Sequence, residues 1–256
     1  MKIFCTVIIL FVWSSSYSQT SKGTHVIIAI CKDGILIGAD SRLGLSNHKS
    51  NAGDIDGYTD NIQKIFGFNN FIMGLMGEFE MRDFKTLYSL TNGFNARLSN
   101  DTTLQAIGAK WYNYALENNL TKLRTVFGHY ENNKPLLAFV HGTLLKTLTA
   151  SSNFLESDSS GFETEYSEKL SCKKTALLIR KYILRYAKVN DAEKYVGGTV
   201  YFLKISKNNK ISWLENKPPK QYEDVRDIWK AYKRGEKKFI FIEKNGEKNL
   251  DSWLNN

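Results

Sequence analysis

Thr24 is the first residue of this sequence to consider for chemistry, because a hydroxyl at this position could attack a carbonyl carbon. A threonine hydroxyl is a poor nucleophile until a base takes up its proton. If the chain is cut directly before Thr24, the new α-amine can act as that base, because its pKa of about 7.7–8.0 leaves it partly neutral near pH 7. The chemistry therefore depends on removal of the residues ahead of Thr24 and on the elements that hold it in place.

The first residues have the layout of a secretory leader. Lys2 supplies a positive charge, residues 3–13 are apolar, and small residues stand at Ser16 and Ser18, where a signal peptidase reads them. The apolar stretch is too short to anchor the chain in a bilayer. We therefore expect a secreted or periplasmic protein without a stable membrane anchor, in which cleavage leaves residues 19–23 as a short pro-segment. A buried first strand is the alternative interpretation of the apolar stretch.

The composition is that of one globular domain. Of the 256 residues, 42% are hydrophobic and 24% are charged, and no linker-like stretch interrupts residues 24–214. The net charge of +9 is spread along the chain without a run of like charges, so we expect no nucleic-acid binding, although a basic surface attracts acidic partners. We divide the chain into a signal peptide, a pro-segment, a main domain and a C-terminal extension, at residues 1–18, 19–23, 24–213 and 214–256.

Neither the histidines nor the cysteines predict a metal or cofactor site. The four histidines are scattered, and no zinc-type spacing occurs. After removal of the leader, Cys31 and Cys172 remain. An oxidising compartment permits a disulfide between them, but Cys31 falls within an apolar run, which is typical of a lone buried thiol.

Two hairpins are predicted near the start of the main domain. Their apolar strands are expected at residues 25–31 and 35–39, and at residues 65–68 and 71–76. Asp33-Gly34 joins the first pair and is a strong turn signal. The apolar runs are continuous, so both faces of these strands should be buried. The polar residues 43–61 between the hairpins are typical of a long surface loop.

The rest of the main domain alternates between helical and strand patterns. Helices are expected at residues 78–89, 104–115 and 172–188, and strands at 124–130, 136–141, 144–150 and 199–205. Each helix has one apolar stripe, so the pattern predicts an α+β fold in which two stacked antiparallel sheets lie between helical layers, a four-layer αββα sandwich. Beyond Trp213 the chain is polar, with a helix expected at 224–232 and a strand at 239–242, and its role stays open.

The stretch from Thr24 to Arg42, THVIIAICKDGILIGADSR, resembles the opening of a proteasome β subunit. In that family a catalytic threonine begins a hairpin that ends in Ala-Asp-Ser-Arg, and Asp40 and Arg42 fall at the family's spacing. Gln63-Lys64-Ile65-Phe66 resembles the segment with the catalytic lysine, and Gly23 matches the glycine that ends the family's leaders. The resemblance covers residues 24–205 and implies a fold and mechanism of the N-terminal nucleophile (Ntn) hydrolase superfamily.

The resemblance also implies a role for each matching residue. Lys64 would favour the developing alkoxide, and Asp40 would keep Lys64 charged and oriented. The segment that ends in Gly77 resembles the small-residue turn whose N–H binds the oxyanion. Weaker matches add Ser160, in a segment like Gly-Ser-Gly, and Glu193, near a segment like Ser-Gly-Gly.

The main departure from the family pattern is Val196, which stands where the family has a serine that supports the α-amine. A valine side chain cannot form hydrogen bonds, so a catalytically silent assembly or binding protein is the alternative to an active threonine peptidase. Joint retention of Thr24, Asp40 and Lys64 favours the enzyme. An amidase acting on a small amide is a third possibility, and assembly into a homo-oligomeric ring is implied by the resemblance alone.

Overall fold

A computed structural model of the chain describes residues 19–22, 25–46, 57–60, 62–77, 79–81, 87–98, 103–120, 122–141, 144–148, 154–156, 169–189, 193, 195–218 and 240–241. The expected signal peptide, Thr24, Ser160 and the helix expected at 224–232 lie outside the described residues.

The first predicted hairpin is confirmed and forms the middle of one five-stranded sheet. This sheet has the order β12-β2-β3-β13-β14, with β12 at Phe154–Glu156, β2 at Val26–Cys31, β3 at Gly34–Asp40, β13 at Val200–Ile205 and β14 at Ile211–Trp213. Cys31 pairs with Gly34 across the two-residue turn, and every residue of β2 and β3 is buried. The continuous apolar pattern of this hairpin therefore does reflect burial on both faces.

The second predicted hairpin lies in another five-stranded antiparallel sheet. Its order is β11-β10-β9-β7-β6, with β11 at Leu144–Leu148, β10 at Lys134–His141, β9 at Leu123–Glu131, β7 at Phe71–Gly77 and β6 at Ile65–Gly67. A buried cluster of residues from β2, β3, β13, β7 and β9 joins the two sheets. Gly74 of β7 allows the close approach, because a Cβ there would lie 2.5 Å from Ile37 Cδ1 on the facing sheet.

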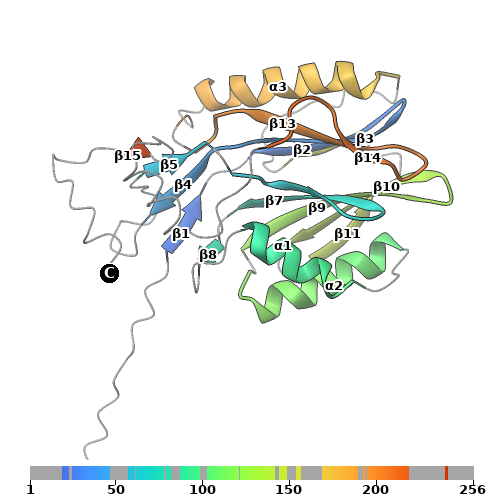
Figure 1. Cartoon of the computed structure of the whole chain (residues 1–256), viewed down its shortest axis with the longest axis horizontal. Coiled ribbons are helices and arrows are strands. Elements are labelled where there is room, and N and C mark those ends of the chain that lie inside the picture. Colours follow the sequence, from blue (N-terminus) through green and yellow to red (C-terminus); the bar gives the residue numbers. More distant parts are fainter. Residues whose placement is uncertain are drawn as a thin grey trace, which may run out of the picture.

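Three helices in the described residues cover the outer faces of these sheets (Figure 1). The helix α3, Cys172–Val189, packs on the sheet of β2 and β3 through Ala176, Ile179 and Ile183. The helices α1, Leu87–Asn95, and α2, Leu104–Glu117, lie against the sheet of β9 and β10, and Thr103 caps α2 by accepting the Ala106 N–H at 3.3 Å. The predicted α+β class with antiparallel sheets is confirmed.

A third sheet was not expected from the sequence. Its order is β15-β5-β4-β1-β8, with β15 at Ile240–Phe241, β5 at Gly57–Thr59, β4 at Leu43–Ser46, β1 at Gln19–Lys22 and β8 at Phe79–Met81. All of its pairings are antiparallel. Residues of the expected pro-segment thus form a strand between β4 and β8, and the C-terminal extension contributes an edge strand.

Two sequence predictions are wrong in this region. Residues 43–46 and 57–59 are strands, where a surface loop was expected, and the helix expected from residue 78 begins only at Leu87. Residues 79–81 form β8 instead, because their backbone groups bond to β1. Short segments of this kind take their conformation from distant partners, which outweigh local helix propensity.

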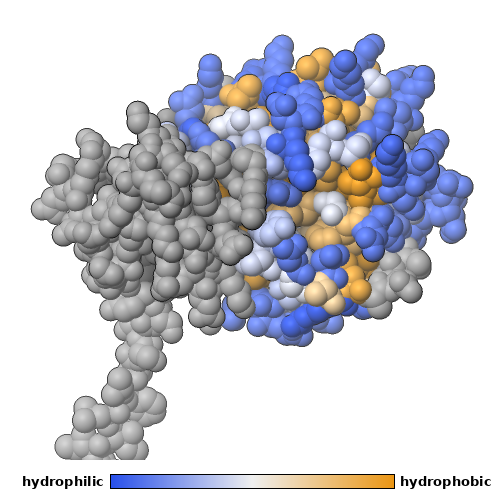
Figure 2. Space-filling model, viewed as in Figure 1, coloured by the Kyte–Doolittle hydropathy of each residue, from blue (hydrophilic) through white to orange (hydrophobic). Residues whose placement is uncertain are grey.

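Hydrophilic residues form most of the outline of the described part of the chain in Figure 2. Figure 2 shows hydrophilic residues gathered over α3, with hydrophobic residues visible between the helical layers. Within the described residues, no helix is both long enough and apolar enough to cross a membrane.

Candidate active site

The candidate site is built around the Asp40 carboxylate at the end of β3. Asp40 is 1% exposed and accepts four hydrogen bonds from described residues. His25 N–H and Lys64 Nζ donate to Oδ1, at 2.9 and 3.0 Å, and the backbone N–H groups of Arg42 and Gly197 donate to Oδ2, at 3.1 and 3.0 Å. These donors occupy both oxygens, so the carboxylate is held in one orientation.

Lys64 is buried beside Asp40, although lysine is seldom buried in proteins. The residue directly precedes β6, and its own carbonyl accepts the Leu75 N–H of β7 at 2.9 Å. The Lys64 ammonium donates to Asp40 and to the Arg42 carbonyl. Burial lowers the pKa of Lys64, and the Asp40 carboxylate opposes that shift. The structure therefore brings together the two residues that the resemblance predicted as partners.

His25, the residue that follows the candidate nucleophile in the chain, contacts this pair through its backbone. Thr24 itself is outside the described residues, but His25 follows it directly in the chain. The His25 N–H belongs to the peptide bond between the two residues and donates to Asp40 Oδ1 at 2.9 Å. Asp40 N–H in turn donates to the His25 carbonyl at 3.4 Å. The same carboxylate oxygen thus contacts Lys64 and the peptide group that links Thr24 to β2.

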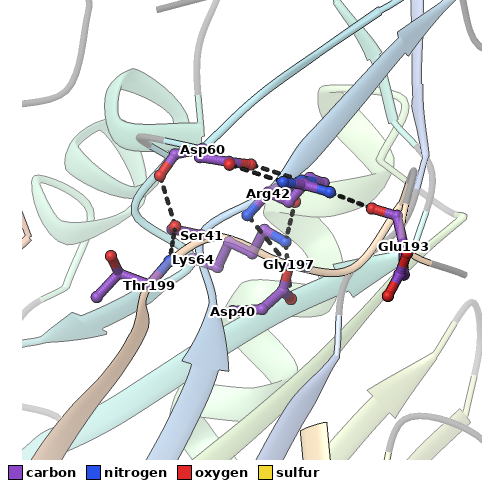
Figure 3. A network of polar contacts seen from close by, with 8 residues as sticks. All are labelled: Asp40, Ser41, Arg42, Asp60, Lys64, Glu193, Gly197 and Thr199. Carbon is purple, nitrogen blue, oxygen red and sulfur yellow. Dashed lines mark hydrogen bonds and ion pairs between the residues drawn. The ribbon is translucent and has the colours of Figure 1, made fainter. Parts of the chain in front are cut away.

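Arg42 takes part in the site through its backbone, while its side chain forms a separate clamp. The guanidinium Nε and Nη2 donate to the two oxygens of Asp60, at 2.6 and 2.7 Å, and the group lies 3.9 Å from the centre of the Tyr58 ring. The hydrogen bonds that Arg42 donates to Asp60 raise the pKa of Arg42. Arg42 also donates to the Glu193 carbonyl and lies between Asp60 and Glu193 (Figure 3). Its side chain ties β5 to the segment before β13.

Asp60 is a residue of the site region that the sequence analysis missed. It follows β5, and its backbone carbonyl accepts the Ser41 hydroxyl at 2.5 Å. Ser41 Oγ accepts the Thr199 N–H at 2.9 Å, so one hydroxyl joins β5 to the start of β13. An acidic residue in a polar stretch gives no signal of its own. Only the arginine after Asp40 could have suggested that a carboxylate partner lies nearby.

The Glu193–Gly198 segment approaches the site mainly through its backbone. Glu193 is exposed, and its carbonyl accepts a hydrogen bond from the Arg42 guanidinium. Val196 is 4% exposed and packs with Cys172, Ala176 and other core residues beneath α3. Val196 is therefore a core residue here, while its neighbour Gly197 supplies an N–H to Asp40.

Gly77, the expected oxyanion donor, ends β7 on the same side of the molecule as Lys64. It lies two residues beyond Leu75, whose N–H donates to the Lys64 carbonyl. Residues 74–77 all belong to β7, where a small-residue turn was expected, and Gly77 at the end of the strand has a φ of 101°. A Cβ at Gly77 would lie 2.7 Å from the Lys122 carbonyl oxygen, so glycine is required on both steric and backbone grounds.

The described residues contain no cluster of three or more histidine, cysteine, aspartate or glutamate side chains that could hold a metal ion. The polar groups that the structure brings together in this site are the buried ammonium, the carboxylate and the backbone N–H groups around it.

Comparison with known proteins identifies similar solved structures. No family model and no curated protein matches the chain. An Anbu (Gly-1) mutant from Hyphomicrobium sp. strain MC1 matches with a TM-score of 0.54 at 15% identity, over 88% of this chain and 100% of that one. The Anbu complex from Pseudomonas aeruginosa, described as a helical assembly, matches with a TM-score of 0.50 at 14% identity, over 82% of this chain and 93% of that one.

Anbu from Yersinia bercovieri, described as an ancestral beta-subunit, also matches, with a TM-score of 0.50 at 11% identity, over 82% of this chain and 94% of that one. These similarities show a shared proteasome-like fold, and they do not show an activity or a substrate of this chain. They correct the resemblance drawn from the sequence, because the similar structures belong to Anbu proteins, a different family from the proteasome β subunits. Asp40 ends β3 and Lys64 directly precedes β6, so the residues that carried the resemblance lie in elements of the two central sheets, which are part of the fold.

Proposed function

We propose that this protein is an exported N-terminal threonine hydrolase that cleaves amide bonds in peptides after Thr24 is freed. The observation that supports the proposal most is the buried Asp40–Lys64 pair, whose carboxylate also accepts the His25 N–H directly after Thr24. A buried lysine paired with a buried carboxylate at the end of a strand is expensive to maintain. Perturbed, buried ionisable groups of this kind are concentrated at functional sites.

In the proposed reaction the freed α-amine takes the Thr24 hydroxyl proton, and the oxygen attacks the carbonyl carbon of the scissile amide. Lys64 stabilises the developing negative charge electrostatically. Burial lowers the pKa of Lys64, so the ammonium form is itself stabilised by a negative charge that develops nearby. Asp40 acts as a positioning residue, since its oxygens are already occupied by donors. The N–H of Gly77 or of the residue after it binds the oxyanion, a contribution worth about 10²–10³ in rate.

A peptide substrate is favoured over a small amide by the position of β1. Gln19–Lys22 is an extended segment that pairs with β4 on one side and β8 on the other, and it leads directly to Gly23 and Thr24. A bound peptide would add a strand in the same manner, with main-chain hydrogen bonds supplying affinity. We further propose that the two central sheets and the helices covering them form a four-layer αββα sandwich, with the third sheet beside it.

A catalytically silent binding or assembly protein is the second candidate. It is favoured by the same strand, because β1 lies inside a sheet and an uncut leader would keep its place there. It is also favoured by Val196, which is in the core and supplies no polar group. The helical assembly reported for the Pseudomonas protein suggests self-association, which light scattering on the purified chain would measure.

The test is the N-terminus of the protein recovered after export, by intact mass, for the wild type, Thr24→Ala and Thr24→Ser. We expect wild-type chains to begin at Thr24 and Thr24→Ala chains to keep the residues ahead of position 24. Thr24→Ser should still be cut, because it retains a hydroxyl, but more slowly than the wild type. Wild-type chains that begin at Gln19 and stay there would exclude the hydrolase. Trapping of Thr24 by a β-lactone separates an active enzyme from a cut but silent protein, and recovery from the cytoplasm alone would refute export.

A further inference from the structure

The turn between β2 and β3 is bonded to the beginning of α3, although the two are far apart in the sequence. Lys32 N–H donates to the Leu170 carbonyl at 2.9 Å, and Cys172 N–H donates to Asp33 Oδ1 at 2.7 Å. The other oxygen of Asp33 accepts Lys204 Nζ at 2.6 Å. Cys31 is the last residue of β2 and Cys172 is the first residue of α3. The hydrogen bonds of their chain neighbours therefore hold the two cysteines close together.

The two thiols are buried together in the cluster beneath α3. Cys31 is 5% exposed and Cys172 is fully buried, and both are reduced in this structure. The Cys31 thiol donates to the Ala29 carbonyl at 3.9 Å, and the interaction between the two thiols lowers the pKa of Cys31 and raises that of Cys172. Cys31 is thus the member of the pair that ionises first. The expectation of a lone buried thiol is replaced by a pair in contact.

We propose that Cys31 and Cys172 form an intramolecular disulfide while the chain folds in an oxidising compartment, and that this bond fastens α3 to the β2–β3 hairpin. The oxidant is a disulfide, either of an exported oxidoreductase or of glutathione. The Cys31 thiolate attacks it to give a mixed disulfide and one free thiol. Cys172 then attacks the Cys31 sulfur and releases the second thiol. Two thiols of this chain lose two electrons and two protons, and the oxidant's disulfide becomes two thiols.

Burial decides when this reaction occurs and what the bond does afterwards. In the folded chain neither sulfur is accessible to an external disulfide, so oxidation takes place before α3 has packed onto β2. Once formed, the bond is protected from reductants in the same way, which makes it a structural link instead of a reversible switch. It closes a loop of roughly 140 residues, a length at which a disulfide restricts the unfolded chain strongly. The inference rests on the export that we propose, and it does not depend on Thr24 or on hydrolysis.

The test uses the full chain, unfolded and reduced, then refolded with either a mixture of oxidised and reduced glutathione or reduced glutathione alone. Thiols are alkylated in denaturant, and peptides are mapped by mass spectrometry so that Cys5 is followed separately. We expect a Cys31–Cys172 link after oxidative refolding, with reduction by dithiothreitol only after denaturant is added. The melting temperature of the linked chain should be about 10 °C above that of the reduced chain.

The double variant Cys31→Ala/Cys172→Ala is the matched control. It should melt at one and the same temperature in both buffers, because it cannot form the link. Free thiols at both positions after oxidative refolding, or links from either of them to Cys5 or glutathione, would overturn the proposal. A linked chain that melts below the reduced one would show that the bond strains the fold and would overturn its structural role.

Discussion

The Lys64 ammonium lies 3.0 Å from Asp40 Oδ1, and neither side chain has any exposed surface. Removing two charges from water costs several kcal/mol for each ion, which their attraction offsets only when geometry and further hydrogen bonds are good. Here the further bonds are present, since Asp40 also accepts three backbone N–H groups and Lys64 also donates to the Arg42 carbonyl.

Asp40→Asn should destabilise the protein by about 3–5 kcal/mol, because it leaves the Lys64 ammonium buried without its counter-charge. The measurement is the free energy of unfolding in urea. The double variant Asp40→Asn/Lys64→Met removes both charges and should lose less than the sum of the two single changes. Additive losses would show that the two residues act independently. Processing before Thr24 should fail in all three variants under the proposed mechanism.

Arg42→Lys should cost about 1–2 kcal/mol of stability, because a lysine cannot reproduce the bidentate contact with Asp60 or the planar stacking on Tyr58. Urea unfolding again measures the loss. Asp60→Asn breaks the same contact from the other side, so the double variant should lose little more than either single change. A double variant with the full sum of losses would refute a shared clamp.

Gly198→Ala should destabilise the chain by about 2–4 kcal/mol. The residue has a φ of 70°, and a Cβ there would lie 2.5 Å from Ser41 Oγ and 2.9 Å from Asp60 Cβ, so the bond from Thr199 to Ser41 would be lost. Gly67→Ala is the control. Its Cβ would meet only side-chain atoms, foremost Ile211 Cγ2 at 2.7 Å, which can rotate away. An equal loss of melting temperature in the two variants would contradict the backbone argument.

Stability should fall between pH 10 and pH 12 because of Tyr130. Burial raises the pKa of Tyr130 from 10.0 to about 12 in the folded chain. Above pH 10 the unfolded chain loses this proton while the folded chain keeps it, so rising pH favours unfolding until the folded pKa is reached. Over this range of pH the free energy of unfolding should fall by about 2 kcal/mol. Urea unfolding of the wild type and Tyr130→Phe between pH 9 and pH 12 isolates the contribution of Tyr130, and parallel pH profiles would rule it out.

Much of the fold could be predicted from local sequence patterns. The β2–β3 hairpin follows from two apolar runs around Asp33-Gly34, and α2 and α3 follow from apolar stripes with a period near 3.6 residues. These signals are carried by neighbours in the chain, so no knowledge of distant partners is needed. The third sheet could not be predicted in this way, because β1, β4 and β8 are short and become strands only by pairing with one another.

The sequence by itself determined the central hairpins, the helices α2 and α3, and a resemblance that marked Asp40 and Lys64 as partners. Only the tertiary structure decided that Asp60 clamps Arg42, that Val196 belongs to the core, and that Cys31 meets Cys172. Each of these contacts joins residues that the folded sheets bring together from distant parts of the chain. Their free energy depends on burial and on distances of a few ångströms, which no periodicity in the sequence records.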